Sequence, residues 1–177
     1  MSEQRTRVSI VPGTGFINLR GDSQNAGFLN AAEVATGQRL PVKANTISEG
    51  ELRVYWLGPD EWLLVCPAEK VADVISQLNE KLSGLHVAVN DISGGNTGMH
   101  LSGESVRALF SKGCTLDFHP KVFKAGDCAQ SGLAKASVLI GLIEGGATFE
   151  LIVRRSFAGY MLNWLRHAGR EYGIEFT

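Results

Sequence analysis

The sequence predicts an α+β fold made of two similar halves, with mixed or antiparallel sheets. Short β-rich runs bounded by Gly, Asn, Asp and Pro alternate with apolar residues at helical spacing. Each half, at about residues 8–84 and 85–172, gives two strands, a helix, three strands and a helix. A local match between LRGDSQNAGF and LSGESVRALF supports an internal duplication. We therefore expect one domain, residues 1–177, whose halves pack around one sheet system.

The first half contains two expected helices. Asp22 is the expected N-cap of a helix that runs toward Gly37. Pro67 stands in the first turn of a clearer helix, in which apolar residues recur at helical spacing until Gly84. Strands are expected at residues 8–11, 15–19, 53–57 and 62–66, with a weaker strand after Leu40.

The second half repeats this order. One helix is expected from about Ser102 to Gly113, and the last begins at Ser156 as its cap. The inward face of the last helix is expected to hold Phe157, Met161, Trp164, Leu165 and Ala168. Strands are expected at residues 86–92, 97–101, 129–134, 138–143 and 148–153.

The composition excludes several classes of partner. The chain has 177 residues, of which 44% are hydrophobic and 20% charged, and its net charge is −1. Such a chain buries one ordinary core but offers no basic stripe for nucleic acid. The N-terminal segment is too polar for a secretion signal, and no run approaches the roughly 18 apolar residues of a membrane span. We expect a cytoplasmic protein that binds neither nucleic acid nor membrane.

Three glycine clusters, at residues 12–16, 93–98 and 145–146, are candidates for phosphate-binding loops. None has the G-x-G-x-x-G or G-x-x-x-x-G-K spacing before a helix, and each joins two expected strands. Hairpin turns are the favoured interpretation, with Gly94, Gly95 and Asn96 supplying positive backbone angles. Nucleotide binding is therefore not expected.

Among all residues, Cys114, Asp117 and His119 have the types and spacing that come nearest to a set of metal ligands. Zinc would need a fourth ligand at suitable spacing, whereas a buried cysteine, a turn aspartate and a histidine before proline need no metal, so the structural interpretation is favoured. The other two cysteines, Cys66 and Cys128, lie far apart and are also expected to be reduced packing residues. No residue is assigned a catalytic, cofactor-binding or metal-binding role.

Arg154 and Arg155 stand immediately before the expected last helix, where positive charge opposes the helix dipole by about 0.3–1 kcal/mol. Two interpretations stay open for this pair. The arginines are solvated or paired locally, or they meet an anion or the acidic surface of a partner with their guanidinium groups. Trp56 and Trp62 bracket a predicted turn, and most of their area is expected in the core.

Four segments along nearly the whole chain resemble the gamma subunit of heterotetrameric sarcosine oxidase. They are LRGD near Arg20, WLGPDEWLLVCP from Trp56, KGCTLDFHPKVFKAGDCAQSGLAKASVLI from Lys112, and FELIVRRSFAGYMLNWL from Phe149. The order of the Gly-Cys, Leu-Asp, His-Pro and Arg-Arg-Ser-Phe steps makes this combination more specific than any step alone. The resemblance implies a fold like the folate-binding domain of glycine-cleavage T-proteins, with two β2αβ3α halves that exchange their first strands.

The same resemblance implies a complex in which this chain carries no cofactor. FAD, FMN, NAD, tetrahydrofolate and zinc belong to the alpha, beta and delta subunits, and the alpha subunit is the expected chief partner. The implied reaction of the complex converts sarcosine to glycine, hydrogen peroxide and a one-carbon unit, released as formaldehyde or passed to tetrahydrofolate. The alternative is a small stand-alone folate-binding or aminomethyltransferase-like protein.

One departure from the T-protein pattern separates these two possibilities. T-proteins carry a motif similar to Gly-Gly-x-x-Asp-Asp-Leu-Ile-Val, in which an aspartate acts in the transfer to folate. The matching stretch here is GGATFELIV, so Phe149 and Glu150 replace the two aspartates. Phenylalanine transfers no proton, and Glu150 should point to the opposite face of its strand from Phe149. The sequence therefore favours a non-catalytic subunit.

Overall fold

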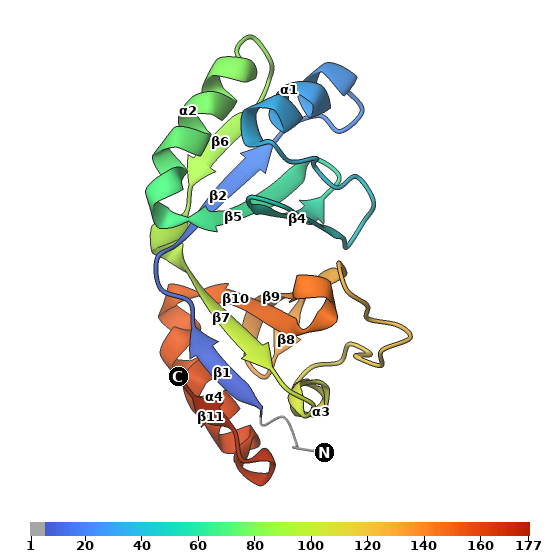
Figure 1. Cartoon of the computed structure of the whole chain (residues 1–177), viewed down its shortest axis with the longest axis vertical. Helices are drawn as coiled ribbons and strands as arrows, with labels where there is room; N and C mark the ends of the chain where they lie inside the picture. Colours follow the sequence, from blue (N-terminus) through green and yellow to red (C-terminus); the bar gives the residue numbers. More distant parts are fainter. Residues whose placement is uncertain (1–5) are drawn as a thin grey trace. The chain divides into compact units, whose positions relative to one another are not determined.

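The computed structural model describes residues 6–177, and their contacts divide them into two compact units. Residues 13–94 are called the N-unit, and residues 6–12 together with 95–177 are called the C-unit. Each unit has its own sheet with helices packed on one face (Figure 1). The expected single sheet system is therefore wrong.

The N-unit contains a five-stranded antiparallel sheet in the order β3-β4-β5-β2-β6. Its strands are β2 (Thr14–Arg20), β3 (Ile47–Glu49), β4 (Arg53–Gly58), β5 (Glu61–Pro67) and β6 (Ala88–Asp91). Its helices are α1 (Ala26–Thr36), the 3-10 turn η1 (Ala68–Lys70) and α2 (Val71–Lys81).

The core of the N-unit lies between this sheet and the two α-helices. Trp62 is fully buried, with its ring 5.5 Å from that of Phe28. Its indole Nε1 donates a 2.8 Å hydrogen bond to the carbonyl oxygen of Pro41, so the buried polar group is satisfied. The expected core role of Trp62 is confirmed, whereas Trp56 is only partly buried.

The C-unit contains a six-stranded sheet in the order β11-β1-β7-β10-β9-β8. Its strands are β1 (Arg7–Ile10), β7 (Asn96–Ser102), β8 (Cys128–Leu133), β9 (Ala136–Ile143), β10 (Thr148–Arg154) and β11 (Glu175–Phe176). Only the pairing of β1 with β11 is parallel. Its helices are α3 (Val106–Ser111) and α4 (Ala158–Ala168), with 3-10 turns η3 (Glu144–Gly146), η4 (Arg155–Phe157) and η5 (Arg170–Tyr172). A further turn, η2 (Ser93–Gly95), leads into β7.

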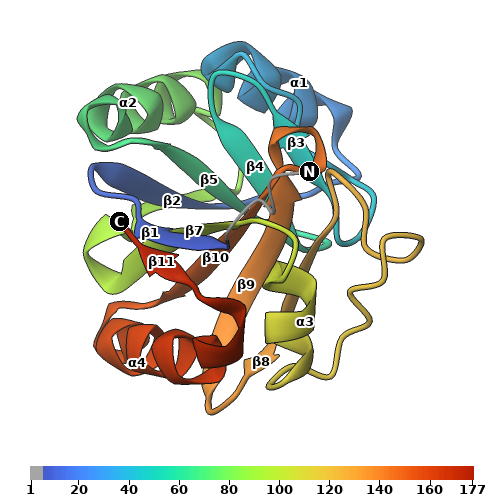
Figure 2. The ribbon, with the colours of Figure 1, turned by 60° about the horizontal axis from the view of Figure 1, so that its bottom comes forward.

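The order of elements confirms two successive β2αβ3α halves, and the first strand of each half pairs in the other sheet. Strand β1 pairs with β7 (Figure 2), and β6 pairs with β2 (Figure 1). The compact units therefore differ from the sequence halves at 8–84 and 85–172.

The duplication itself stays a prediction, but residues at matching positions of the two halves are buried to a similar extent. Leu19 and Leu101 are fully buried at the ends of β2 and β7, and Phe28 and Phe110 are buried in the helices that follow.

The glycines at the matched step act differently in the two halves. A side chain at Gly21 would collide with the ring of Phe28, 2.3 Å from the nearest ring atom, so this glycine makes room for core packing. Gly103 instead has a φ of 111°, which other residues rarely adopt. A backbone angle that favours glycine thus explains Gly103, whereas close packing explains Gly21.

All four predicted helix starts need correction. Pro67 ends β5, and α2 begins at Val71 after the turn η1. The N-cap of helix α1 is Asn25, whose Oδ1 accepts hydrogen bonds from the Gly27 and Phe28 amides, while Asp22 caps only the preceding turn. Helix α3 is shorter than expected, and Ser156 lies inside η4 and caps nothing. The left-handed end of α1 at Gly37 is confirmed. None of the described helices is long and apolar enough to cross a membrane.

The glycine clusters also need partial correction. Gly145 and Gly146 have φ values of 66° and 99° in the hairpin between β9 and β10, as expected there. The other two clusters connect strands of different sheets and form no hairpin. Gly94, Gly95 and Asn96 have no positive φ, because their segment forms a 3-10 turn before β7.

Candidate functional site

Phe149 stands where the T-protein motif has its first aspartate. It lies on β10 and packs in a cluster of aromatic rings from α3 and the loop that follows it. Its ring centroid is 5.3 Å from that of Phe110 and 6.1 Å from those of both Phe118 and Phe123. The Phe149 side chain is 5% exposed. The Phe149 side chain is therefore surrounded by aromatic rings and contributes packing energy to the core of the C-unit.

Arg107 fixes the loop that supplies two of these rings. Its guanidinium donates hydrogen bonds to the carbonyl oxygens of Phe118 and Phe123, and its Cζ lies 5.1 Å from the Phe149 centroid. Desolvation by burial lowers the pKa of Arg107 from its ordinary value, but an arginine shifted from so high a value stays charged. Arg107 is thus a structural cation, and sequence reasoning missed it because its carbonyl partners are up to 16 residues away in the chain.

Glu150 points to the other face of the sheet, as expected from strand alternation. It is fully buried, and its Oε1 lies 3.2 Å from His100 Nε2 on β7, which is its direct cross-strand neighbour. A buried carboxylate requires such pairing to offset its desolvation. Glu150 is therefore separated by the sheet from the aromatic cluster around Phe149.

Cys114, Asp117 and His119 make separate contacts and do not converge on one point. Asp117 Oδ1 accepts a 2.8 Å hydrogen bond from the His119 amide, and both side chains are exposed. Cys114 is buried, with Sγ 3.5 Å from the Ser131 hydroxyl oxygen. Within residues 6–177, no three His, Cys, Asp or Glu side chains are grouped so that they could hold a metal ion. All three cysteines are buried.

Arg154 and Arg155 are exposed where β10 passes into η4 and then α4. No side chain caps α4, and its first turn contains no acidic residue. Both arginines lack an ion pair with any carboxylate that the structure describes. Local pairing of the two arginines, one of the open interpretations, is therefore not observed.

Two exposed aromatic side chains lie directly beside these arginines. Phe157 is 42% exposed and Tyr160 is 37% exposed, and their rings meet edge to face at 6.2 Å. Phe157 was expected to face inward with Met161 and Leu165, which are indeed buried. It points outward because η4 breaks the helical phase before α4 begins. Aromatic spacing alone does not reveal such a 3-10 turn.

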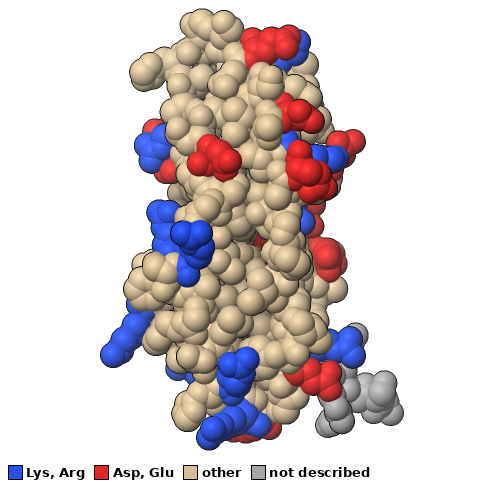
Figure 3. Space-filling model, turned by 90° about the vertical axis from the view of Figure 1, so that its left-hand side faces the viewer, with Lys and Arg blue, Asp and Glu red and all other residues tan. Residues whose placement is uncertain are grey.

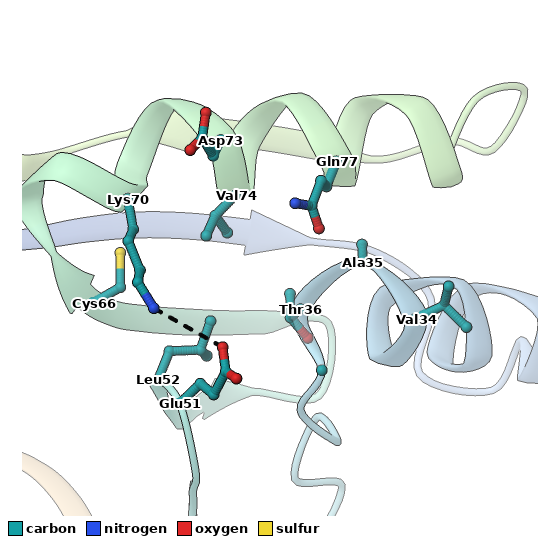
Figure 4. A pocket seen from close by; sticks show the side chains of 11 residues that line it. Val34, Ala35, Thr36, Glu51, Leu52, Cys66, Lys70, Asp73, Val74 and Gln77 are labelled. Atoms are coloured by element: carbon teal, nitrogen blue, oxygen red, sulfur yellow. Dashed lines mark ion pairs between the residues drawn. The ribbon is translucent and has the colours of Figure 1, made fainter.

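The N-unit contains a pocket of about 350 Å³ between the end of α1, the start of β4 and one side of α2 (Figure 4). Leu52, Cys66 and Val74 contribute apolar surface, and Lys70, Asp73 and Gln77 contribute polar groups. The ammonium group of Lys70 is 3.9 Å from the Glu51 carboxylate, and both side chains are largely exposed. Such a loose surface pair contributes little energy.

Cys66 is the one thiol among the residues that line this pocket, and its environment favours the protonated form. Burial, followed by the negative charge of Glu69, raises the pKa of the thiol above its ordinary value. The thiolate needed for nucleophilic chemistry is therefore disfavoured near neutral pH. The pocket has room for a small polar molecule, but it assembles no nucleophile with a base.

The two units differ in charge. The N-unit has 6 Lys and Arg against 10 Asp and Glu, a net charge of −4. The described C-unit has 10 Lys and Arg against 7 Asp and Glu, a net charge of +3. On the face drawn in Figure 3, basic side chains gather over the part that carries α4, and acidic ones over the part that carries α2. The net charge of the whole chain hides this asymmetry.

Comparisons with known proteins agree on one family. Residues 20–171 match the model of the sarcosine oxidase gamma subunit family. The chain is 31% identical over 164 residues to a sarcosine oxidase subunit gamma from Corynebacterium sp. (strain P-1), which covers 90% of this chain and 77% of that relative. It is 30% identical to the corresponding subunit from Corynebacterium sp. (strain U-96), over 96% of this chain and 82% of the relative.

Solved structures give the same result. A chain of the heterotetrameric sarcosine oxidase from Corynebacterium sp. U-96, in complex with pyrrole 2-carboxylate, superposes with a TM-score of 0.88 and 26% identity. That match covers 97% of this chain and 87% of the other. The glycine cleavage system aminomethyltransferase T from Bartonella henselae superposes with a TM-score of 0.70 at 14% identity, over 98% of this chain but 48% of the other, which establishes a shared fold.

Proposed function

The chain belongs to the sarcosine oxidase gamma subunit family, and we propose that it serves as the non-catalytic gamma subunit of a heterotetrameric sarcosine oxidase. The complex would oxidatively demethylate sarcosine to glycine, hydrogen peroxide and a one-carbon unit. The observation that carries this proposal is the match over 97% of the chain to one chain of such an assembly.

The geometry around Phe149 supports a non-catalytic role. Oxidation of a secondary amine needs a hydride acceptor, which protein side chains do not provide. The position that matches the first aspartate of the T-protein motif holds Phe149, which is packed among aromatic rings and carries no carboxylate. This packing also disfavours the alternative of a stand-alone folate-binding or aminomethyltransferase-like protein.

The proposed partners are the alpha, beta and delta subunits, chiefly alpha. FAD, FMN, NAD, tetrahydrofolate and zinc would be held by those subunits, and this chain would contribute binding and positioning. A cytoplasmic location is part of the same proposal.

Co-purification tests this function directly. A tagged version of the chain, co-expressed with the other subunits of the same host's enzyme, should bring down all of them in equal amounts, with a flavin absorption spectrum. The chain purified alone should be colourless and should produce no peroxide from sarcosine. A separate titration with tetrahydrofolate decides against the stand-alone alternative if no binding is found. Flavin or peroxide production by the chain alone would contradict the proposal.

A further inference from the structure

The strand pairing of the C-unit brings five exposed or half-exposed residues to one end of its sheet. Arg154 ends β10 opposite Asn96, the first residue of β7. Lys135 lies in the turn between β8 and β9. Val138, near the start of β9, pairs with Val153, near the end of β10, so this turn lies at the same end of the sheet as Arg154. Arg155, Phe157 and Tyr160 follow directly in η4 and the first turn of α4. The basic-aromatic surface is defined as Lys135, Arg154, Arg155, Phe157 and Tyr160.

Four acidic residues of the C-unit lie at other ends of its strands or form ion pairs of their own. Glu104 follows the opposite end of β7, and Glu144 precedes the opposite end of β10, where its carboxylate accepts a hydrogen bond from the Thr148 hydroxyl. Glu171 and Glu175 form ion pairs with Lys112 and Arg7. Among the residues described, no carboxylate forms an ion pair with Lys135, Arg154 or Arg155. The surface therefore carries three unneutralised positive charges.

The local energetics of this surface are unfavourable in the isolated chain. Positive charge beside the uncapped start of α4 opposes the helix dipole, and no acidic residue in the first turn offsets it. A carboxylate supplied from outside the chain would interact favourably with both the arginines and the helix start. The basic-aromatic surface therefore lacks a negative charge that would stabilise it.

The aromatic pair has the character of an interface anchor. Tyr and Arg are enriched among the residues that dominate binding energy at protein interfaces. The Tyr160 hydroxyl accepts a 3.2 Å hydrogen bond from the Lys135 amide, and its ring packs against that of Phe157. Both rings are therefore held in place before binding, which reduces the entropy lost on association.

We propose that the basic-aromatic surface docks onto an acidic surface of a larger subunit of the complex, with Phe157 inserted into an apolar recess and carboxylates facing Arg154 and Arg155. This inference rests on the proposed function and names the surface that performs it. Charge complementarity selects the occupant, because three basic groups without counter-charges surround two exposed rings. A second copy of this chain, docking through its acidic N-unit, is the competing occupant.

Charge reversal tests the surface in the co-expressed complex. The double variant Arg154→Glu/Arg155→Glu should weaken retention of the larger subunits by about tenfold or more, because like charges then meet across the contact. The matched control is Lys121→Glu/Lys124→Glu, which makes the same charge change on an exposed loop of the C-unit. The control should assemble like the wild type. If the wild type assembles and both double variants assemble equally well, the docking surface is wrong.

Site-specific crosslinking identifies the occupant. A photocrosslinking amino acid in place of Phe157 should attach the chain to a larger subunit within an acidic segment, whereas the same group in place of exposed Val122 should not. A crosslink to a second copy of this chain would overturn the assigned partner. Failure of the wild-type chain to assemble at all would instead refute the proposed function, so the two failures are distinguishable.

Discussion

Helices α1 and α4 hold different places in the repeated order of elements, and their N-termini are built in opposite ways. The N-cap of helix α1 in the N-unit is Asn25, whose Oδ1 accepts hydrogen bonds of 2.9 Å and 3.2 Å from two orphan amides. Helix α4 of the C-unit has no side-chain cap and is preceded by Arg154 and Arg155. The first helix start is optimised for folding. The second leaves its helix terminus and two cations available to a partner.

The aromatic cores of the two units also differ, because only the core of the C-unit includes a residue that matches the T-protein motif. In the N-unit, Phe28 and Trp62 pack between helix and sheet as ordinary core residues. In the C-unit, Phe149 completes a cluster at the position where the T-protein motif has an aspartate. Aromatic packing thus fills the core of both units, and in the C-unit this packing includes Phe149.

Restoring an aspartate at Phe149 should have the largest effect. Phe149→Asp removes a buried ring and places a carboxylate among aromatic side chains, so the free energy of unfolding should fall by about 4 kcal/mol. Phe149→Leu, the matched control, should lose about 1.5 kcal/mol, because an apolar side chain is retained. Urea denaturation followed by circular dichroism measures both. A stable Phe149→Asp protein that binds tetrahydrofolate would reverse the interpretation of this position.

Removing the N-cap of α1 should lower the free energy of unfolding by less than the substitution of Phe149 does. Asn25→Ala removes the acceptor for the Gly27 and Phe28 amides, and the free energy of unfolding should fall by about 1 kcal/mol. Asn25→Ser keeps a capping oxygen and should be nearly neutral. Assembly with the larger subunits should be unchanged in both variants. Loss of assembly without loss of stability would place the partner contact in the N-unit instead.

A substitution before the start of α4 should change the free energy of unfolding in the opposite direction. Arg155→Glu puts a favourable charge beside the helix N-terminus and should raise the free energy of unfolding by about 0.5 kcal/mol. The same change should weaken assembly, because it removes a cation from the basic-aromatic surface. Thermal unfolding of the isolated chain and co-purification of the complex measure the two effects. A variant that is less stable yet assembles normally would contradict the comparison of the two helix starts.

The smallest effects concern acid titration. The Ser93 hydroxyl and amide both donate to Asp91 in the N-unit, which lowers the pKa of that carboxyl from its ordinary value. A hydrogen bond and the charge of Lys112 likewise lower the pKa of Glu171 in the C-unit. Because the folded-state pKa is depressed, each contribution to stability is present above the unfolded-state pKa and is lost as the pH falls through the folded-state pKa. Ser93→Ala should raise the pKa of Asp91, as followed by NMR, while that of Glu171 stays unchanged.

Much of the fold could be predicted from the sequence because local patterns carry it. The two β2αβ3α halves follow from periodicity, and the family resemblance supplied the exchange of first strands. The short strand β11 was missed, because two residues give no pattern and only the pairing with β1 defines it. The α1 cap was misplaced because both Asp22 and Asn25 are good capping residues and only the backbone decides between them.

The candidate site was harder to predict than the fold. Arg154 and Arg155 could be singled out because two cations before a helix conflict with its dipole. Phe157 and Tyr160 could not, because their exposure depends on η4, which shifts the phase of the helical pattern. The hydrogen-bond partners of Arg107 and the charge difference between the units depend on contacts between segments far apart in the chain.

Omission of the chain from the complex tests its central role most directly. The alpha, beta and delta subunits are expressed with and without this chain, and gel filtration is combined with a peroxide assay on the same fractions. If the chain is a non-catalytic positioning subunit, its omission should yield dissociated or unstable subunits with little peroxide production, and its addition should restore both. A stable, fully active complex that forms without the chain would contradict the proposed function.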